Sequence, residues 1–161
     1  MKLDTAANVD LYRYLGKWYE MARFDSRFEH NCCNVTAEYS LNTKGYITFV
    51  NTYCIASPNG IKKLSIGYAK VAGPIKNSKL RVSFLPRFLT FLDPLFGVKY
   101  WILKLERDYS IALVGEPRRK YLWILSRNPE IAQSQYDEYV AAAAAMGFDV
   151  SKLHKTLQQW Q

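Results

Sequence analysis

Apolar and polar positions alternate with period two along several short segments of the chain. Residues 16–24 read Gly-Lys-Trp-Tyr-Glu-Met-Ala-Arg-Phe, which places Trp18 and Phe24 on one face of a strand and Tyr19 and Met21 on the other. Neither face is purely polar. This pattern is typical of a strand that lines an interior on one side and packs against another element on the other.

The alternation recurs at regular intervals. Residues 34–41 alternate cleanly and predict a half-buried strand, and the turn at 42–45 with the run 45–54 predicts its hairpin partner. Further strand-like runs occupy residues 62–71, 79–85, 100–107, 109–115 and 121–127. Eight strands joined without helical interludes predict an all-β fold, an eight-stranded antiparallel up-and-down barrel, or calyx, over about residues 15–127.

The pattern changes after the last strand. Asn128 is a good N-cap, Pro129 suits the first helical position, and apolar residues then recur every three or four positions as far as Ala143. Gly147 is a typical helix terminator. We therefore expect a helix over about 129–146, packed outside the barrel, and a tail over 147–161, all within a single domain of 161 residues.

The net charge of +8 raises the prior for nucleic acid, anionic membranes or acidic ligands. The basic residues cluster in predicted loops and not along a strand face, which argues against nucleic acid as a partner. No apolar run is long enough to span a bilayer, and no secretory leader begins the chain, so any leader is expected to be missing from it.

The chain has three cysteines, with Cys32 and Cys33 adjacent and Cys54 further on. This spacing matches no zinc motif, and no metal site is predicted. Two states are compatible with this spacing. Either Cys54 forms a disulfide with Cys32 or Cys33, or all three cysteines are free thiols.

Three motifs in order resemble the signatures of the lipocalins: Gly16-Lys17-Trp18, Arg107-Asp108-Tyr109, and the run from Trp123 to Pro129. The resemblance covers essentially the whole chain and is strongest to the bacterial lipocalins and the apolipoprotein D-like branch. It implies that Trp18 closes the floor of the barrel and that Arg127 packs across its ring. Gly16, Trp18 and Arg127 are then structural residues.

A barrel of eight strands is wide enough to hold one small ligand. Side chains alternate between the two faces of a strand, so if Trp18 faces inward, Glu20 does too, and we interpret it as a structural carboxylate. On the strand that contains Lys104, we expect this lysine to face outward and its immediate neighbours to face inward. On the fourth strand we favour the small residues Ser65 and Gly67 inside. A completely filled core is the alternative. The predicted ligand-binding residues are Phe24, Val35, Ala37, Tyr39, Ile47, Phe49, Asn51, Leu80, Val82, Phe84, Trp101, Leu103, Tyr121 and Trp123.

Alternate connections of a meander share one end of the barrel, which is the expected mouth. A basic collar there favours an anionic head group, and its members are Lys62, Lys63, Arg87, Arg118 and Arg119. The connection over residues 84–98 is rich in Phe and Leu. It would fold over the mouth as a lid, touch a membrane surface, or pack in a homodimer contact.

The resemblance and the cavity together predict a non-enzymatic carrier, without a cofactor, for a small hydrophobic ligand such as a fatty acid or lysophospholipid. The resemblance implies a lipid-anchored protein of the bacterial periplasm or outer membrane. One alternative is a lipid-modifying isomerase, which needs an inward cysteine, whereas Cys54 is predicted to face outward. The other is a module that binds a membrane surface.

Overall fold

A computed structural model describes residues 2–24, 32–43, 46–71, 78–83 and 97–160. Eight antiparallel strands follow one another around a sheet that closes because β1 pairs with both β8 and β2. The predicted calyx is confirmed. Its strands are β1 (Gly16–Phe24), β2 (Cys32–Leu41), β3 (Ile47–Ile55), β4 (Lys62–Val71), β5 (Lys79–Ser83), β6 (Val98–Leu105), β7 (Ile111–Gly115) and β8 (Leu122–Ser126).

A short helix that the sequence analysis did not foresee lies across the closed end of the barrel. It is α1 (Leu11–Tyr14), and Asp10 caps it by accepting a hydrogen bond from the backbone N–H of Tyr12 at 2.9 Å. The carbonyl oxygen of Tyr14 accepts a hydrogen bond from the indole N–H of Trp18, also at 2.9 Å. This contact joins α1 to the first residues of β1, so the chain N-terminal to the barrel forms its floor.

Arg127 fastens the floor from outside. Its guanidinium carbon lies 4.0 Å from the ring centroid of Trp18, which is fully buried. The same guanidinium donates to the carbonyl oxygens of Leu15 at 2.8 Å and Lys17 at 2.9 Å. Gly16, between those two carbonyls, has a φ of +92°, and a Cβ there would lie 3.3 Å from the guanidinium. The three residues therefore lie as the resemblance implies.

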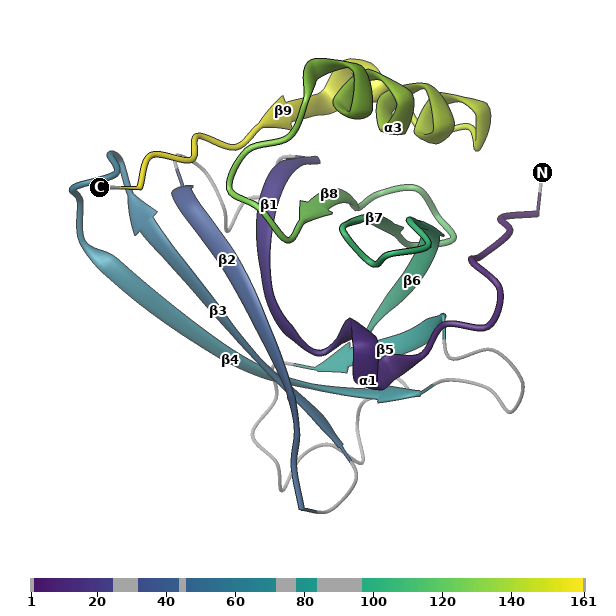
Figure 1. Ribbon diagram of the computed structural model, residues 1–161, viewed down its shortest axis with the longest axis horizontal. Helices are drawn as coiled ribbons and strands as arrows, with labels where there is room; N and C mark the ends of the chain where they lie inside the picture. The colour runs from purple at the N-terminus through teal and green to yellow at the C-terminus, as the bar shows by residue number, and fades with distance from the viewer. Residues whose placement is uncertain (1, 25–31, 44–45, 72–77, 84–96, 161) are drawn as a thin grey trace.

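The helix α3 (Gln133–Ala145) lies against the outer face of the barrel (Figure 1). Two of its own residues, Tyr139 and Ala143, are fully buried against the barrel, and the Tyr139 hydroxyl donates to the carbonyl oxygen of Ile111 at 3.0 Å. The helix begins four residues later than predicted. The N-cap is Ala132, whose N–H donates to the side-chain oxygen of Gln135 at 3.2 Å.

Gly147 ends this helix as predicted. It has a φ of +82°, and the N–H of Phe148 returns to the carbonyl oxygen of Ala143 at 3.1 Å. No helix among the residues described here is long and apolar enough to cross a bilayer.

After α3, a 3₁₀ turn η2 (Val150–Lys152) leads into the short strand β9 (Leu153–Lys155), which pairs with the last three residues of β1. The chain then bridges β1 and β2. The Gln158 side-chain amide donates to the carbonyl oxygens of Glu20 at 2.7 Å and Val35 at 2.9 Å. Asn34 exchanges hydrogen bonds with the backbone of Gln159 through its side-chain amide. The tail therefore closes the seam where β1 and β2 diverge.

Candidate ligand cavity

The barrel encloses a cavity of about 600 Å³ above its packed floor. Residues from β1 to β6 and β8, together with Tyr121 just before β8, contribute to its wall. The described lining residues are Glu20, Cys32, Val35, Ala37, Tyr39, Phe49, Asn51, Tyr53, Ser65, Val82, Val98, Tyr100, Tyr121, Trp123 and Leu125. Most of this surface is aliphatic or aromatic, which suits an apolar guest of modest size.

The structure brings many of the predicted ligand-binding residues together around this cavity. They are Val35, Ala37, Tyr39, Phe49, Asn51, Val82, Tyr121 and Trp123. Ile47 and Leu80 also point to the interior, but they lie lower, packed with Tyr14 and Trp18 in the floor. The lower part of the barrel is thus a filled core, and only the upper part is hollow. Phe84 lies outside the described residues.

Strand β6 corrects the predicted parity. Trp101 and Leu103 pack in the outer cluster beneath α3, whereas Tyr100 lines the cavity. The register with β7 shifts between Ile102 and Lys104, so a bulge changes the parity within the strand. Lys104 is outside as predicted, in an ion pair with Glu138 of α3. Strict alternation from Lys104 predicts that Trp101 and Leu103 face inward, and the bulge makes this prediction wrong.

A second bulge changes the parity of β1. Its register with β8 shifts between Glu20 and Ala22, so Phe24 faces outward and not into the cavity as predicted. The Phe24 ring lies 6.1 Å from the ring of Phe148, centroid to centroid. Because of the same shift, the side chain of Arg23 is buried and contacts Glu20.

Glu20 and Arg23 form a buried ion pair. The Arg23 guanidinium lies 2.6 Å from the Glu20 carboxylate, and each side chain is 6% exposed. The Thr156 hydroxyl donates to the same carboxylate oxygen at 2.5 Å and accepts from Arg23 at 3.2 Å. The structural carboxylate expected from the sequence therefore has partners from both β1 and the C-terminal tail. It was not predictable that Thr156 would be one of them.

Aromatic rings run along one wall of the cavity. The rings of Tyr121 and Trp123 stack with centroids 5.9 Å apart, and Trp123 stacks on Tyr100 at 6.3 Å. Tyr100 then contacts Tyr39 at 6.2 Å. Burial raises the pKa of Tyr39 to about 12 and that of Tyr100 well above its usual value, so both phenols stay neutral at physiological pH.

The residues of the predicted basic collar differ in their exposure. Lys62, Lys63 and Arg118 are exposed on the β3–β4 and β7–β8 sides. Arg119 is instead tied to α3, since its Nε donates to the carbonyl oxygen of Met146 at 2.8 Å. Arg87, and the apolar connection through residue 96, lie outside the described residues.

The three cysteines are free thiols in this structure, and the disulfide considered from the sequence is not formed. Cys33 and Cys54 are register partners on the outer side of β2 and β3, and burial raises the pKa of the Cys33 thiol. Cys32 lines the cavity. Cys54, the thiol considered above, is therefore not the inward one. That one of the two adjacent cysteines faces inward follows from the alternation of side chains along a strand.

A closed antiparallel barrel with a plugged floor and an apolar interior cavity defines a calyx that accommodates small hydrophobic molecules. Residues 9–158 match the family model described as a lipocalin-like domain. The chain belongs to the lipocalin family.

Among similar proteins, temperature-induced lipocalin-1 of Arabidopsis thaliana is 39% identical over 98% of this chain and 83% of its own length. Outer membrane lipoprotein Blc of Escherichia coli strain K12 is 43% identical over 90% of this chain and 77% of its own length. Mouse apolipoprotein D is 30% identical over 94% of this chain and 78% of its own length. The similarity to the bacterial lipocalins and apolipoprotein D confirms the resemblance read from the motifs.

Solved structures share the fold at lower identity. Insecticyanin from the tobacco hornworm Manduca sexta has a TM-score of 0.72 and 18% identity, with 100% of this chain and 86% of that chain covered. Lobster apocrustacyanin A1 has a TM-score of 0.67 and 18% identity, with 99% and 91% covered.

Proposed function

We propose that the protein binds and carries a small hydrophobic ligand, most simply a fatty acid or a lysophospholipid. The observation that carries this proposal is the apolar cavity of about 600 Å³ inside a closed barrel. Burial of each CH₂ group contributes about 0.8 kcal/mol, so a long acyl chain offers on the order of 10 kcal/mol against an association cost of about 4–15 kcal/mol. Burial of an acyl chain therefore gives useful affinity where the association cost lies in the lower half of this range.

The exposed basic residues of the mouth support an anionic head group at the entrance. Lys62, Lys63 and Arg118 are exposed there, and the net charge of the chain is +8. Relatives at 43% and 32% identity are named outer membrane lipoproteins. These names support the proposal that the protein acts in the bacterial cell envelope, in the periplasm or anchored to the outer membrane through a lipid.

The outer face of β4 supports contact with a larger partner. Leu64 is 64% exposed and Ile66 is 56% exposed, next to Lys62 and Lys63. Apolar and basic groups side by side suit the surface of an anionic membrane, and the apolar pair alone would suit a second copy of the chain. We propose that the connection over residues 84–98 also contributes to contact with a membrane or with a second copy of the chain.

The proposal is tested by titrating the protein with lysophospholipid and with a fatty acid while tryptophan fluorescence is recorded. Binding should change the emission of Trp123, which lines the cavity. Trp123→Ala should weaken both ligands, whereas Trp160→Phe, a change at an exposed tryptophan of the tail, should not. Equal affinity in wild type and Trp123→Ala would place the ligand outside the barrel.

The collar is tested separately with Lys62→Glu combined with Arg118→Glu, which leaves the helix contact of Arg119 in place. We expect a larger loss of affinity for an anionic than for a zwitterionic lysophospholipid. An equal loss of affinity for both lipids would contradict the proposal that the basic collar binds an anionic head group.

An enzyme is the second candidate, because the Cys32 thiol lines the cavity. A carrier should return its lipid chemically unchanged, as judged by mass spectrometry after incubation and extraction. Conversion of the lipid that disappears in Cys32→Ala would favour the enzyme.

A further inference from the structure

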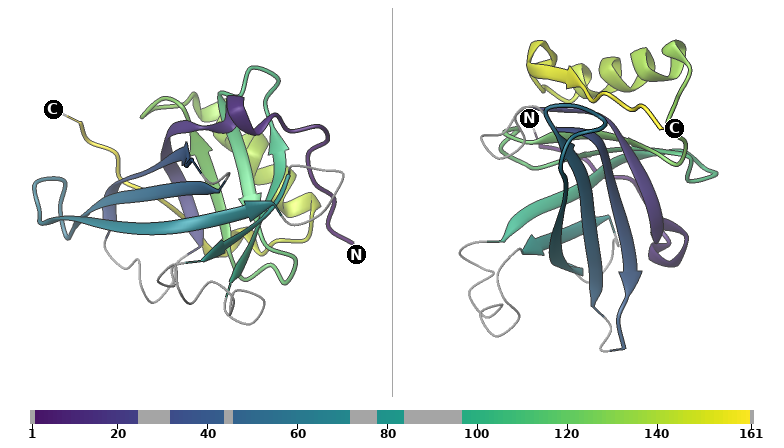
Figure 2. Two further views of the ribbon diagram at one scale, coloured as in Figure 1. Left: turned by 90° about the horizontal axis from the view of Figure 1, so that it is seen from below. Right: turned by 90° about the vertical axis from the view of Figure 1, so that its left-hand side faces the viewer.

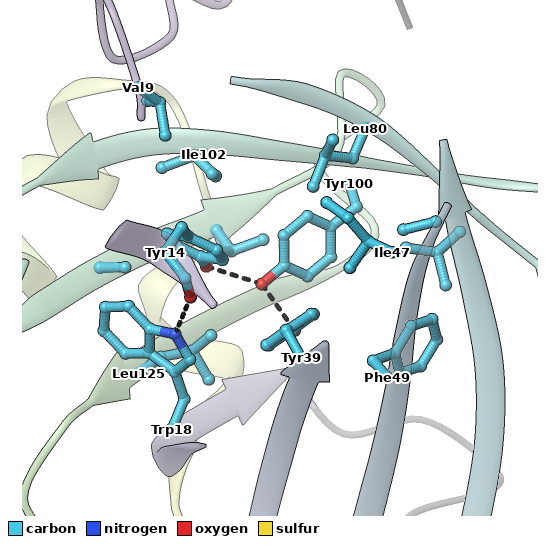
Figure 3. Packing of buried hydrophobic residues seen from close by; sticks show 14 of the residues in the cluster. Val9, Tyr14, Trp18, Tyr39, Ile47, Phe49, Leu80, Tyr100, Ile102 and Leu125 are labelled. Carbon is cyan, nitrogen blue, oxygen red and sulfur yellow. Dashed lines mark hydrogen bonds between the residues drawn. The ribbon is translucent and has the colours of Figure 1, made fainter. Parts of the chain in front are cut away.

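Three tyrosine hydroxyls meet within the buried cluster at the closed end of the barrel (Figure 3). The Tyr100 hydroxyl lies 2.9 Å from the hydroxyl of Tyr14 and 2.9 Å from that of Tyr39. All three side chains are buried, and the rings of Tyr39 and Tyr100 line the cavity, whereas Tyr14 belongs to α1 in the floor. The cluster therefore forms the polar part of the closed end of an otherwise apolar container.

This cluster has one hydroxyl hydrogen more than it has hydrogen bonds within the cluster. Three hydroxyls carry three hydrogens, and each of the two contacts consumes one. Tyr100 cannot donate to both neighbours, so three arrangements of the hydrogens are possible. The unused hydrogen lies on Tyr14 in one of them and on a lining phenol, Tyr39 or Tyr100, in the other two. Among the described residues, no further acceptor bonds to any of these hydroxyls.

A buried donor without an acceptor is costly, so such groups almost always find a partner. Rotation of the hydroxyls moves the unused hydrogen along the cluster without changing the number of bonds within it. An acceptor that arrives from the cavity would select an arrangement in which Tyr39 or Tyr100 donates to it.

The surroundings favour a neutral acceptor over an anion. Among the described lining residues none is basic and one, Glu20, is acidic. The neighbouring base, Arg23, is already in an ion pair with Glu20 at 2.6 Å. A carboxylate or phosphate at the closed end would lose its hydration without gaining a counter-ion. A hydroxyl or carbonyl oxygen needs only the one donor that the cluster offers.

We propose that the closed end of the cavity is a subsite for a neutral oxygen, a hydroxyl or a carbonyl, on the end of the ligand that enters first. This inference rests on the proposed function and deepens it. With an anionic head group at the mouth, the ligand is a lipid oxygenated at the end remote from its head group.

The test compares fatty acids with omega-hydroxy fatty acids of the same chain length, over a series of lengths. Each pair has the same head group and differs only in the remote hydroxyl. The proteins are the wild type, the double variant Tyr39→Phe with Tyr100→Phe, and the single variant Tyr39→Phe. Tyr68→Phe makes the same chemical change on a barrel strand outside the cavity lining.

At the best chain length, the wild type and Tyr68→Phe should bind the omega-hydroxy acid at least as tightly as its parent. The double variant should bind it about tenfold more weakly than the parent, because the buried hydroxyl then lacks a partner. Tyr39→Phe should lie between, since Tyr100 can still donate. Because the readout is a ratio of affinities within one protein, a general loss of stability does not imitate it.

If the parent acids bind and the ratio is the same in wild type and in both cluster variants, the subsite is wrong while the proposed carrier function stands. If neither kind of acid binds the wild type, the carrier function fails and the subsite fails with it.

Discussion

The two sides of the barrel differ in what covers them. On one side β7 is buried at every position and β8 at all but one, because the cavity or floor lies on one face and α3 on the other. On the other side β4 keeps Leu64 and Ile66 exposed, and no described helix lies over β2, β3 and β4 (Figure 2). We call these the covered and the uncovered side.

The comparison shows where a pattern of alternation is informative. On the uncovered side one face meets solvent, so period two distinguishes inside from outside, and Val35, Ala37 and Phe49 line the cavity as predicted. On the covered side both faces are apolar. A bulge can then exchange them without leaving a sign in the sequence, as happened at Phe24 and Trp101.

The largest expected effect distinguishes a buried ion pair from an exposed one. Glu20→Ala should lower the free energy of unfolding by about 3–5 kcal/mol, because it leaves the buried charge of Arg23 unpaired. Glu138→Ala removes the exposed partner of Lys104 on α3 and should cost no more than about 1 kcal/mol. Urea unfolding of both variants measures the difference, and equal costs would contradict the burial of the first pair.

A matched pair of leucines compares the two sides directly. Leu113 on β7 is fully buried, and Leu113→Ala should cost about 2–5 kcal/mol. Leu64 on β4 is 64% exposed, and Leu64→Ala should change stability by at most about 0.5 kcal/mol. The same denaturation experiment applies. A large cost at Leu64 would mean that this face is covered in solution, as a dimer contact would require.

The dependence of stability on alkaline pH tests the burial of the Tyr39 phenol. Burial raises the pKa of Tyr39 to about 12, so folding favours its neutral form. The resulting stability is complete below the unfolded pKa of about 10 and is lost as pH rises from about 10 towards 12. Unfolding free energies measured across this range should fall less steeply in Tyr39→Phe. A steeper fall in that variant would contradict the assignment.

The smallest effect concerns neighbouring cysteines on the uncovered side. A register shift between Cys33 and Thr36 leaves Cys32 in the cavity wall and Cys33 on the outer side, paired in register with Cys54. A bound fatty acid should therefore slow alkylation of Cys32 and leave the other two thiols unaffected. Single-cysteine variants followed by mass spectrometry make this measurement. Protection of Cys33 in place of Cys32 would reverse the assigned faces.

The sequence was informative wherever a local signal had one structural meaning. The motifs at Trp18 and Arg127 identified the family, and the turns and runs located the strands closely. The helix start was misplaced because Asn128 and Pro129 form a good capping signal, whereas the structure uses Ala132 and Gln135. Local signals therefore settled which elements form, and less well where they begin.

By itself the sequence determined the calyx, its closed floor and, away from bulges, the inward faces of the uncovered strands, because these follow from alternation and from motifs along the chain. Only the tertiary structure decided the bulges, the Thr156 contact that completes the Glu20–Arg23 pair, and the meeting of Tyr14, Tyr39 and Tyr100. These features depend on which distant segments pack together. Side chains far apart in the sequence meet there to satisfy one another's buried charges and hydrogen bonds, and no local pattern records such a requirement.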